Sequence, residues 1–441
     1  MREPNRNVFL FLTQLSSPFS RKKWVKSIHR NVHSHDVRSI VATQRTIFSG
    51  GIDCLLAVND ITTRSMAMYA PVPHGDCVVL AEAGNLVVMR HPTYLEVWKL
   101  GAADRGGAEN GEWAPGSVLK LATEPEKVLE LHSKDDETIR SCAVSPDGAW
   151  VAYASCTRLR AYRLTLGDQV RLERASVECD IEIPHHIRFY GGCKMVSATE
   201  RGSLQFFEFD EREMSVRLME TVEGKDLHLS GGISHLAATA KGDVVVAVDY
   251  AGNVSSLDAH SRKFLAKMPR YQRAAVTALS LNPTNGDLLV LAYADNHVVE
   301  CHARSGRYSK FSKSSLETAF PKQWKSKKTA TRGAVQLGLE QLVLWDDANI
   351  CVVDRKCGEG GDAAAAAAPR SKQAKEKEGE TRTTAAAKKR DARQVRITRK
   401  YEHLVHLGAL SDGALVAVEV RPQSIEEQLP PSLRQKKFGA M

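Results

Sequence analysis

The sequence of 441 residues lacks any apolar run near the roughly 18–20 residues that a membrane-spanning helix needs, so we do not expect a membrane protein. The apolar run at residues 8–12 is short and is followed by polar and basic residues without a small-residue cleavage pattern, which argues against a signal peptide. Long apolar stripes at helical spacing are nearly absent too, and this argues against a helical fold.

The number and spacing of the cysteines argue against a disulfide scaffold and against a zinc site. The nine cysteines are odd in number, and no C-x-x-C occurs. The pattern therefore matches neither a disulfide scaffold nor a zinc site. Most cysteines lie in apolar, strand-like contexts, as Cys142 and Cys351 do. We expect reduced, buried thiols in an intracellular protein.

What the sequence does contain is a repeat. Short β-rich runs, paired across turn residues, recur about every 40 residues. The clearest unit runs through residues 139–144, the turn Ser145-Pro146-Asp147-Gly148, and residues 150–153 and 160–164. Proline presets φ in that turn, and glycine accepts the positive φ that ends it. Other units begin near residues 36, 77, 187, 233, 276 and 341, with a partial unit at 404–418.

A four-stranded unit of this period is typical of a β-propeller blade, whose faces are buried only by packing on neighbouring blades. We therefore predict an all-β, WD40-like β-propeller of about seven blades. Tandem β-sandwiches are the alternative. The Trp-Asp dipeptide of such blades is degenerate here, as in Trp98-Lys99, so the prediction depends on the period and the strand pattern.

Positive charge is concentrated in four segments, residues 1–38, 304–332, 355–400 and 421–441, which together carry +24. The net charge of the chain is +9, so the remaining stretches carry −15. Basic arms on an acidic body predict a polyanionic partner, nucleic acid first.

Three of these basic segments supply candidate contacts to RNA or to acidic partners. Residues 304–332 interleave lysines with aromatic residues, a pattern that can bind phosphates and stack bases. The alternative is a solvated loop whose aromatic residues are anchored on the propeller. The candidates are Lys310, Lys313, Lys322, Trp324, Lys325, Lys327, Lys328, Lys388, Lys389, Arg390, Lys436 and Lys437.

No catalytic motif was found among the serine-hydrolase, kinase and paired-carboxylate patterns. His33 and His35 with Asp36, and the pair His185-His186, have no third ligand nearby. Histidine near the first strand of a propeller blade commonly belongs to a structural hydrogen-bond network. We expect a non-enzymatic binding platform with no metal, no cofactor and no small-molecule substrate.

Several ordered motifs carry a family resemblance. They include His35–Arg38, Leu95–Gly101, Ser145–Tyr153 and Val276–Leu279. The tail is the most specific part, with Leu415–Glu419, Gln428–Pro431 and Lys436–Gly439 in that order. On these residues the chain resembles the cirhin family, the U3 small-nucleolar-RNA-associated WD40 proteins of the small-subunit processome.

The resemblance implies tandem propellers, of which this chain covers the C-terminal half. Residues 1–30 look like the last two strands of a preceding blade, at Asn7–Leu15 and Lys23–Lys26. Residues 31–357 form the propeller, 358–393 a disordered Ala/Lys/Glu insertion, 394–420 the closing strands and 421–441 a basic tail. The partial unit at 404–418 pairs either with residues 7–27 or, in a full-length relative, with the other half.

The resemblance also implies a function. The family consists of nucleolar, non-catalytic scaffolds that join other WD40 proteins in an early processome subcomplex on pre-rRNA and U3 snoRNA. They support pre-18S rRNA processing, small-subunit biogenesis and transcription of ribosomal DNA. The alternative is a generic WD40 adaptor that binds peptides, chromatin or ubiquitin-ligase partners.

Overall fold

A computed structural model gives the fold of the chain. It describes residues 7–14, 23–33, 36–52, 55–62, 66–69, 77–102, 121–167, 169–177, 181–239, 241–313, 322–327, 329–355, 395–401 and 403–420. These residues are mostly β-strand, and helix is confined to short segments such as η2 (Lys134–Asp136), η3 (Gly224–Leu227) and α2 (Lys322–Lys325). The all-β prediction is confirmed. Within the described ranges, no helix has the length and apolarity needed to cross a bilayer.

Most of the strands form small antiparallel sheets of four. The first sheets in the chain are a hairpin of two strands and a sheet of four. They comprise β1 (Asn7–Gln14) and β2 (Lys23–Asn31), then β3 (Val37–Ala42), β4 (Thr46–Gly51), β5 (Leu56–Asp60) and β6 (Met66–Tyr69).

Seven further sheets follow in chain order. The first three are β7 (Val78–Ala81), β8 (Leu86–Arg90), β9 (Tyr94–Lys99) and β10 (Glu126–His132); β11 (Ile139–Val144), β12 (Trp150–Ser155), β13 (Leu159–Thr165) and β14 (Arg171–Arg174); and β16 (Pro184–Tyr190), β17 (Lys194–Thr199), β18 (Leu204–Asp210) and β19 (Ser215–Val222), with β15 (Ser176–Val177) added parallel to β19. The next two are β20 (Ile233–Ala238), β21 (Val244–Asp249), β22 (Val254–Asp258) and β23 (Phe264–Lys267); and β24 (Val276–Leu281), β25 (Leu288–Tyr293) and β26 (Val298–His302). The last two are β27 (Gly333–Leu337), β28 (Gln341–Trp345), β29 (Ile350–Asp354) and β30 (Val395–Thr398); and β31 (Leu404–Ala409) with β32 (Leu415–Glu419).

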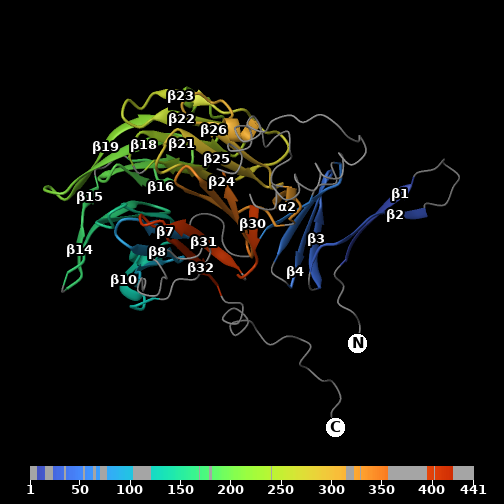
Figure 1. Cartoon of the computed structure of the whole chain (residues 1–441), viewed down its shortest axis with the longest axis horizontal. Coiled ribbons are helices and arrows are strands. Elements are labelled where there is room, and N and C mark those ends of the chain that lie inside the picture. The colour runs from blue at the N-terminus through green and yellow to red at the C-terminus, as the bar shows by residue number, and fades with distance from the viewer. Residues whose placement is uncertain are drawn as a thin grey trace, which may run out of the picture.

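The first strands of these seven sheets contact one another in a closed cycle. β7 contacts β11, and the contacts continue through β16, β20, β24 and β27 to β31, which returns to β7. Figure 1 shows the same closure, because the red strands β31 and β32 lie beside the blue β7 and β8. Small four-stranded sheets in cyclic order are consistent with a WD40-like propeller.

The hydrophobic core lies between neighbouring sheets rather than inside any one of them. Val343 of β28 and Leu407 of β31 belong to one buried cluster, and Val87 of β8 and Val405 of β31 belong to the next. Similar clusters join each of the other neighbouring pairs. A single sheet has no closed core of its own, so the stability of each blade depends on its neighbours.

The sheet β3–β6 stands apart from this cycle. Its small cluster, around Ile47 and Ala57, draws on its own strands and on Val32. It is linked to the stretch before β27 by a parallel bridge between Met68 and Thr329. The unit near residue 36 therefore has the predicted strands, but the main contacts that close the cycle do not include it.

The two hairpins at the ends of the chain are separate sheets. β1 pairs with β2, and β31 pairs with β32. Strands are present at Asn7–Gln14 and Lys23–Asn31, where the two strands were predicted. Among the described residues of these segments, 404–418 does not pair with residues 7–27, which was one of the two alternatives.

The turn at residues 145–148 has the predicted geometry. Gly148 has φ of +80° and donates its N–H to the Ser145 carbonyl at 2.9 Å. The Pro146 carbonyl accepts the N–H of Ala83 at 2.9 Å, so the turn also docks on the preceding sheet. A Cβ at Gly148 would lie 2.7 Å from Leu86 Cδ1, which is a second reason for glycine at this position.

The long insertion falls between two paired strands. β29 pairs antiparallel with β30, with Val353 opposite Val395. The residues that separate these strands, 356–394, lie outside the described ranges, as does the predicted disorder of 358–393. The flanking strands close the sheet across the insertion, as expected for a loop inserted between two strands of one blade.

The described cysteines are free thiols, and four of the six are buried. Burial raises the pKa of Cys142, Cys301 and Cys351 to about 12. These thiols are therefore neutral, weakly reactive core side chains, as expected from their strand contexts.

Candidate interaction surfaces

The basic segment 304–332 combines exposed lysines with buried aromatic residues. Lys310, Lys313 and Lys325 are exposed, and Lys322 begins α2. Lys327 is half-buried, and its Nζ donates to Asn349 Oδ1 at 3.1 Å. The other candidates lie outside the described residues, namely Lys328, Lys388, Lys389, Arg390, Lys436 and Lys437.

Trp324 is a core residue. Its side chain is fully buried in a cluster with Ala278, Leu342 and Leu344. Its indole N–H donates to Thr331 Oγ1 at 2.7 Å. The ring therefore has no free face on which a nucleic-acid base could stack. Trp324 is not available as a contact to RNA or to an acidic partner, contrary to the prediction. The alternative interpretation, an aromatic residue that anchors the loop, describes its position.

A buried ion pair close to this segment gave no signal in the sequence. Arg355 Nη2 lies 2.6 Å from Glu300 Oε2, and the same guanidinium donates to Gln336 Oε1 at 3.0 Å. The contact with Glu300 is an ion pair without a well-directed hydrogen bond. Burial lowers the pKa of Arg355, and Glu300 opposes that shift. The pair ties β26 to the end of β29, beside the ring of Phe311, whose centroid is 5.8 Å from the guanidinium carbon.

Three histidines, which we call the inner-strand histidines, lie on the first strands of different sheets. They are His186 of β16, His235 of β20 and His406 of β31, all half-buried. Desolvation by burial lowers the pKa of His186 to about 3, and those of His235 and His406 to about 4. Arg188 of β16 lowers the last two further by charge repulsion. These imidazoles are therefore neutral at pH 7.

Two of the histidines considered above as possible metal ligands form structural hydrogen bonds between elements. His185 Nε2 donates to the Ile233 carbonyl at 2.6 Å, across neighbouring sheets. His33 Nε2 lies 3.0 Å from Ser49 Oγ. His35 lies outside the described residues, within which no cluster of three or more His, Cys, Asp or Glu side chains is arranged to hold a metal ion.

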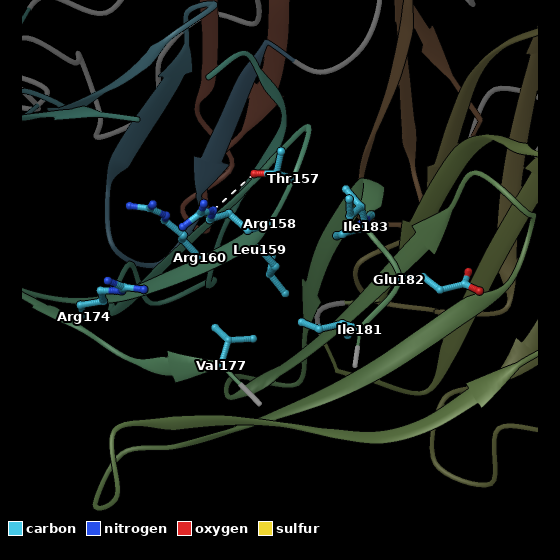
Figure 2. A pocket seen from close by; sticks show the side chains of 10 residues that line it. Thr157, Arg158, Leu159, Arg160, Arg174, Val177, Ile181, Glu182 and Ile183 are labelled. Carbon is cyan, nitrogen blue, oxygen red and sulfur yellow. Dashed lines mark hydrogen bonds between the residues drawn. The ribbon is translucent and has the colours of Figure 1, made fainter. Parts of the chain in front are cut away.

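A pocket of about 250 Å³ opens between the sheet β11–β14 and the sheet β15–β19. Figure 2 shows Arg158, Arg160 and Arg174 together on one side, and Val177 and Ile181 across from them. The residues that line it are Thr157, Arg158, Leu159, Arg160, Arg174, Val177, Ile181, Glu182, Ile183 and Pro184.

The electrostatics of the pocket are positive because its carboxylate is engaged elsewhere. Glu182 accepts from Arg201 Nη1 at 3.3 Å and from Ser203 Oγ at 3.2 Å. Figure 2 shows its carboxylate directed away from the three arginines. The nearby Glu137 accepts hydrogen bonds from Ser155 and Thr157, which lower its pKa.

The pocket has the chemistry of a binding site. The described side chains that line it are arginines, aliphatic groups, one threonine and the carboxylate of Glu182, which already accepts two hydrogen bonds. Such a set can pair with an anion and pack against an aliphatic group. Sequence reasoning missed it because the arginines belong to β13, β14 and the turn before them, and the apolar wall belongs to the next sheet. No local spacing brings these segments together.

No protein-family model matches the chain. The "U3 small nucleolar RNA-associated protein 4 homolog" of Mus musculus is 27% identical over 448 residues, covering 98% of this chain and 62% of that protein. The Homo sapiens protein of the same name is 25% identical over 450 residues, with the same two coverages. "U3 small nucleolar RNA-associated protein 4" of Saccharomyces cerevisiae is 23% identical over 353 residues, 74% of this chain and 42% of that protein.

These similarities support the resemblance drawn from the ordered motifs. The chain spans 62% of the length of the mouse and human relatives that it matches.

Proposed function

We propose that the chain is a non-catalytic WD40 scaffold of the small-subunit processome, located in the nucleolus. In this role it supports pre-18S rRNA processing and small-subunit biogenesis, and it contributes to transcription of ribosomal DNA. The observation that carries the proposal is similarity along 98% of the chain to proteins named for association with U3 small nucleolar RNA. The cyclic arrangement of small sheets supports it, because propellers commonly act as binding platforms.

We further propose a propeller of about seven blades. The cycle of contacts favours a ring that begins at β7 and ends at β32, rather than one that begins at residue 31. The sheet β3–β6 and the hairpin β1–β2 then belong to a preceding unit. In this arrangement the Ala/Lys/Glu insertion at 358–393 falls within the β27–β30 blade, and 421–441 is a basic tail.

Open strand edges support an assembly role. Within the described residues the β31–β32 sheet has two strands, and Leu415 of β32 is 39% exposed. In β3, Ile40 and Val41 are 53% and 62% exposed. Unpaired edges and exposed apolar strands readily accept strands from another chain. We propose that other WD40 proteins of the early processome subcomplex cover these surfaces.

Association with U3 RNA is the first test. The tagged chain is immunoprecipitated from the cells that produce it, and the co-purified RNA is sequenced. We expect U3 snoRNA and pre-rRNA to be enriched over a tag-only control. If neither RNA is enriched, the processome assignment is wrong.

Nuclease treatment before immunoprecipitation distinguishes this proposal from that of a generic WD40 adaptor. Digestion of RNA before immunoprecipitation should remove late processome partners and leave the early WD40 partners. A diffuse nucleoplasmic location, with partners such as chromatin or ubiquitin-ligase proteins that are unaffected by nuclease, favours the adaptor instead.

Direct RNA contact by the basic segment is tested separately. Replacement of Lys310, Lys313 and Lys325 by alanine should reduce the salt dependence of binding to a single-stranded RNA of mixed sequence. Each lost phosphate contact lowers the slope of log K against log salt by about 0.7. A charge-matched control replaces Lys134, Lys225 and Lys263, which are exposed on the acidic body. An equal slope for the two triple variants contradicts direct contact.

A further inference from the structure

The pocket between the sheets β11–β14 and β15–β19, described above, has two walls of different chemistry. One wall presents the guanidinium groups of Arg158, Arg160 and Arg174 (Figure 2). The facing wall is aliphatic, with Val177, Ile181 and the adjacent Ile183 and Pro184.

Only part of the charge on the cationic wall is paired with carboxylates of the described residues. The side chain of Arg174 is exposed and forms no hydrogen bond or ion pair with any described residue. The guanidinium Nε of Arg158 is 3.9 Å from Glu137 Oε1, a carboxylate already bonded to two hydroxyl groups. Arg160 is only 8% exposed, so its charge is held in place where water screens it poorly. A carboxylate or phosphate that entered the pocket would meet three positive groups.

The aliphatic wall distinguishes between anionic partners. Ile183 is 37% exposed although it is a large apolar residue, whereas Val177 and Ile181 pack partly against the core below. The described residues of the lining include no aromatic side chain on which a base could stack. Aliphatic side chains instead match an aliphatic residue of a peptide. The pocket volume of about 250 Å³ is large enough for one or two side chains.

We propose that this pocket binds a short peptide segment of a partner protein in which an acidic residue lies beside an aliphatic one. The acidic side chain pairs with the arginines, and the aliphatic side chain packs on Val177, Ile181 and Ile183. The proposal deepens the scaffold function proposed above by naming the chemistry of one docking site. Its test measures peptide binding directly, so its outcome does not depend on association with U3 RNA.

The test begins with a displayed library of random ten-residue peptides, selected on the purified full chain. We expect the enriched peptides to share an acidic residue next to leucine, isoleucine or valine. In fluorescence anisotropy, Arg174→Glu and Ile183→Ser should each weaken the best peptide by about tenfold or more, the cost of one charge-assisted contact or one buried aliphatic contact. Binding should also weaken with added salt.

Arg171→Glu is the matched control. Arg171 lies on the same strand as Arg174 and is also exposed, but it does not line the pocket. It should bind the selected peptide like the unaltered chain. Enriched peptides without acidic residues, or equal losses in Arg171→Glu and Arg174→Glu, overturn the proposal. A parallel selection with random RNA overturns it as well if Arg174→Glu weakens only the RNA.

Discussion

Replacing Trp324 by alanine is expected to lower the free energy of unfolding by about 3–5 kcal/mol, the cost of removing a fully buried large aromatic side chain. The side chain is 0% exposed and fills the core between the sheets β24–β26 and β27–β30. Its removal leaves a cavity, and it also leaves Thr331 without the indole donor at 2.7 Å. Because the cluster is shared by two sheets, we expect the damage to reach both.

Urea unfolding followed by circular dichroism measures this change. Trp324→Phe keeps most of the apolar volume and removes the N–H, so it should cost clearly less than alanine. Tyr250→Ala removes an aromatic side chain that is 74% exposed and should leave the unfolding midpoint nearly unchanged. A Trp324→Ala chain of normal stability that has lost RNA affinity would instead make Trp324 a binding residue, contrary to its burial.

Trp324 also shows where sequence reasoning reached its limit in the basic segment. Aromatic residues among lysines fit either a stacking surface or an anchored loop, since both place rings beside positive charge. The choice depends on which sheets the segment crosses, and that is a tertiary property. The strands themselves were predictable, because alternation and turn residues are local signals, as at residues 139–148.

Local sequence signals could not predict which sheets belong to the ring or where the pocket lies, because both depend on how the sheets pack. The unit at 37–69 has the strand pattern of any blade, yet its sheet lies outside the cycle of contacts. The pocket needs Arg158 and Arg174 from one sheet and Ile181 from the next. A repeat specifies each blade, whereas the packing of blades decides which side chains meet.

Acidification from pH 6.5 to pH 4 is expected to lower the free energy of unfolding by several kcal/mol, chiefly through the inner-strand histidines. Their pKa values in the folded chain are about 3 for His186 and about 4 for His235 and His406. The unfolded value is about 6.5. Between these values the unfolded chain binds protons that the folded chain does not, so the free energy of unfolding rises with pH. The stability is complete above about pH 6.5 and is lost as the pH falls toward 4.

The charges around these histidines explain why the folded chain resists protonation. His186 lies near His185, His235 and Arg90, and both His235 and His406 lie near Arg188. Each added proton would therefore join existing positive charge in a poorly hydrated place. Carboxyl groups with lowered pKa values, such as Asp249 and Asp258, titrate below this window.

A triple variant isolates the histidine contribution. Glutamine at positions 186, 235 and 406 can still donate a hydrogen bond but does not titrate, so the free energy of unfolding should vary much less between pH 6.5 and 4. Each proton that is no longer taken up reduces the slope by about 1.4 kcal/mol per pH unit. His132→Gln with His260→Gln removes two histidines that are 59% and 62% exposed, and this control should keep the original slope. Equal slopes for the triple variant and the unaltered chain would place the acid sensitivity in other groups. That result would also mean that burial does not hold the pKa values of these three imidazoles below their ordinary value in the folded chain.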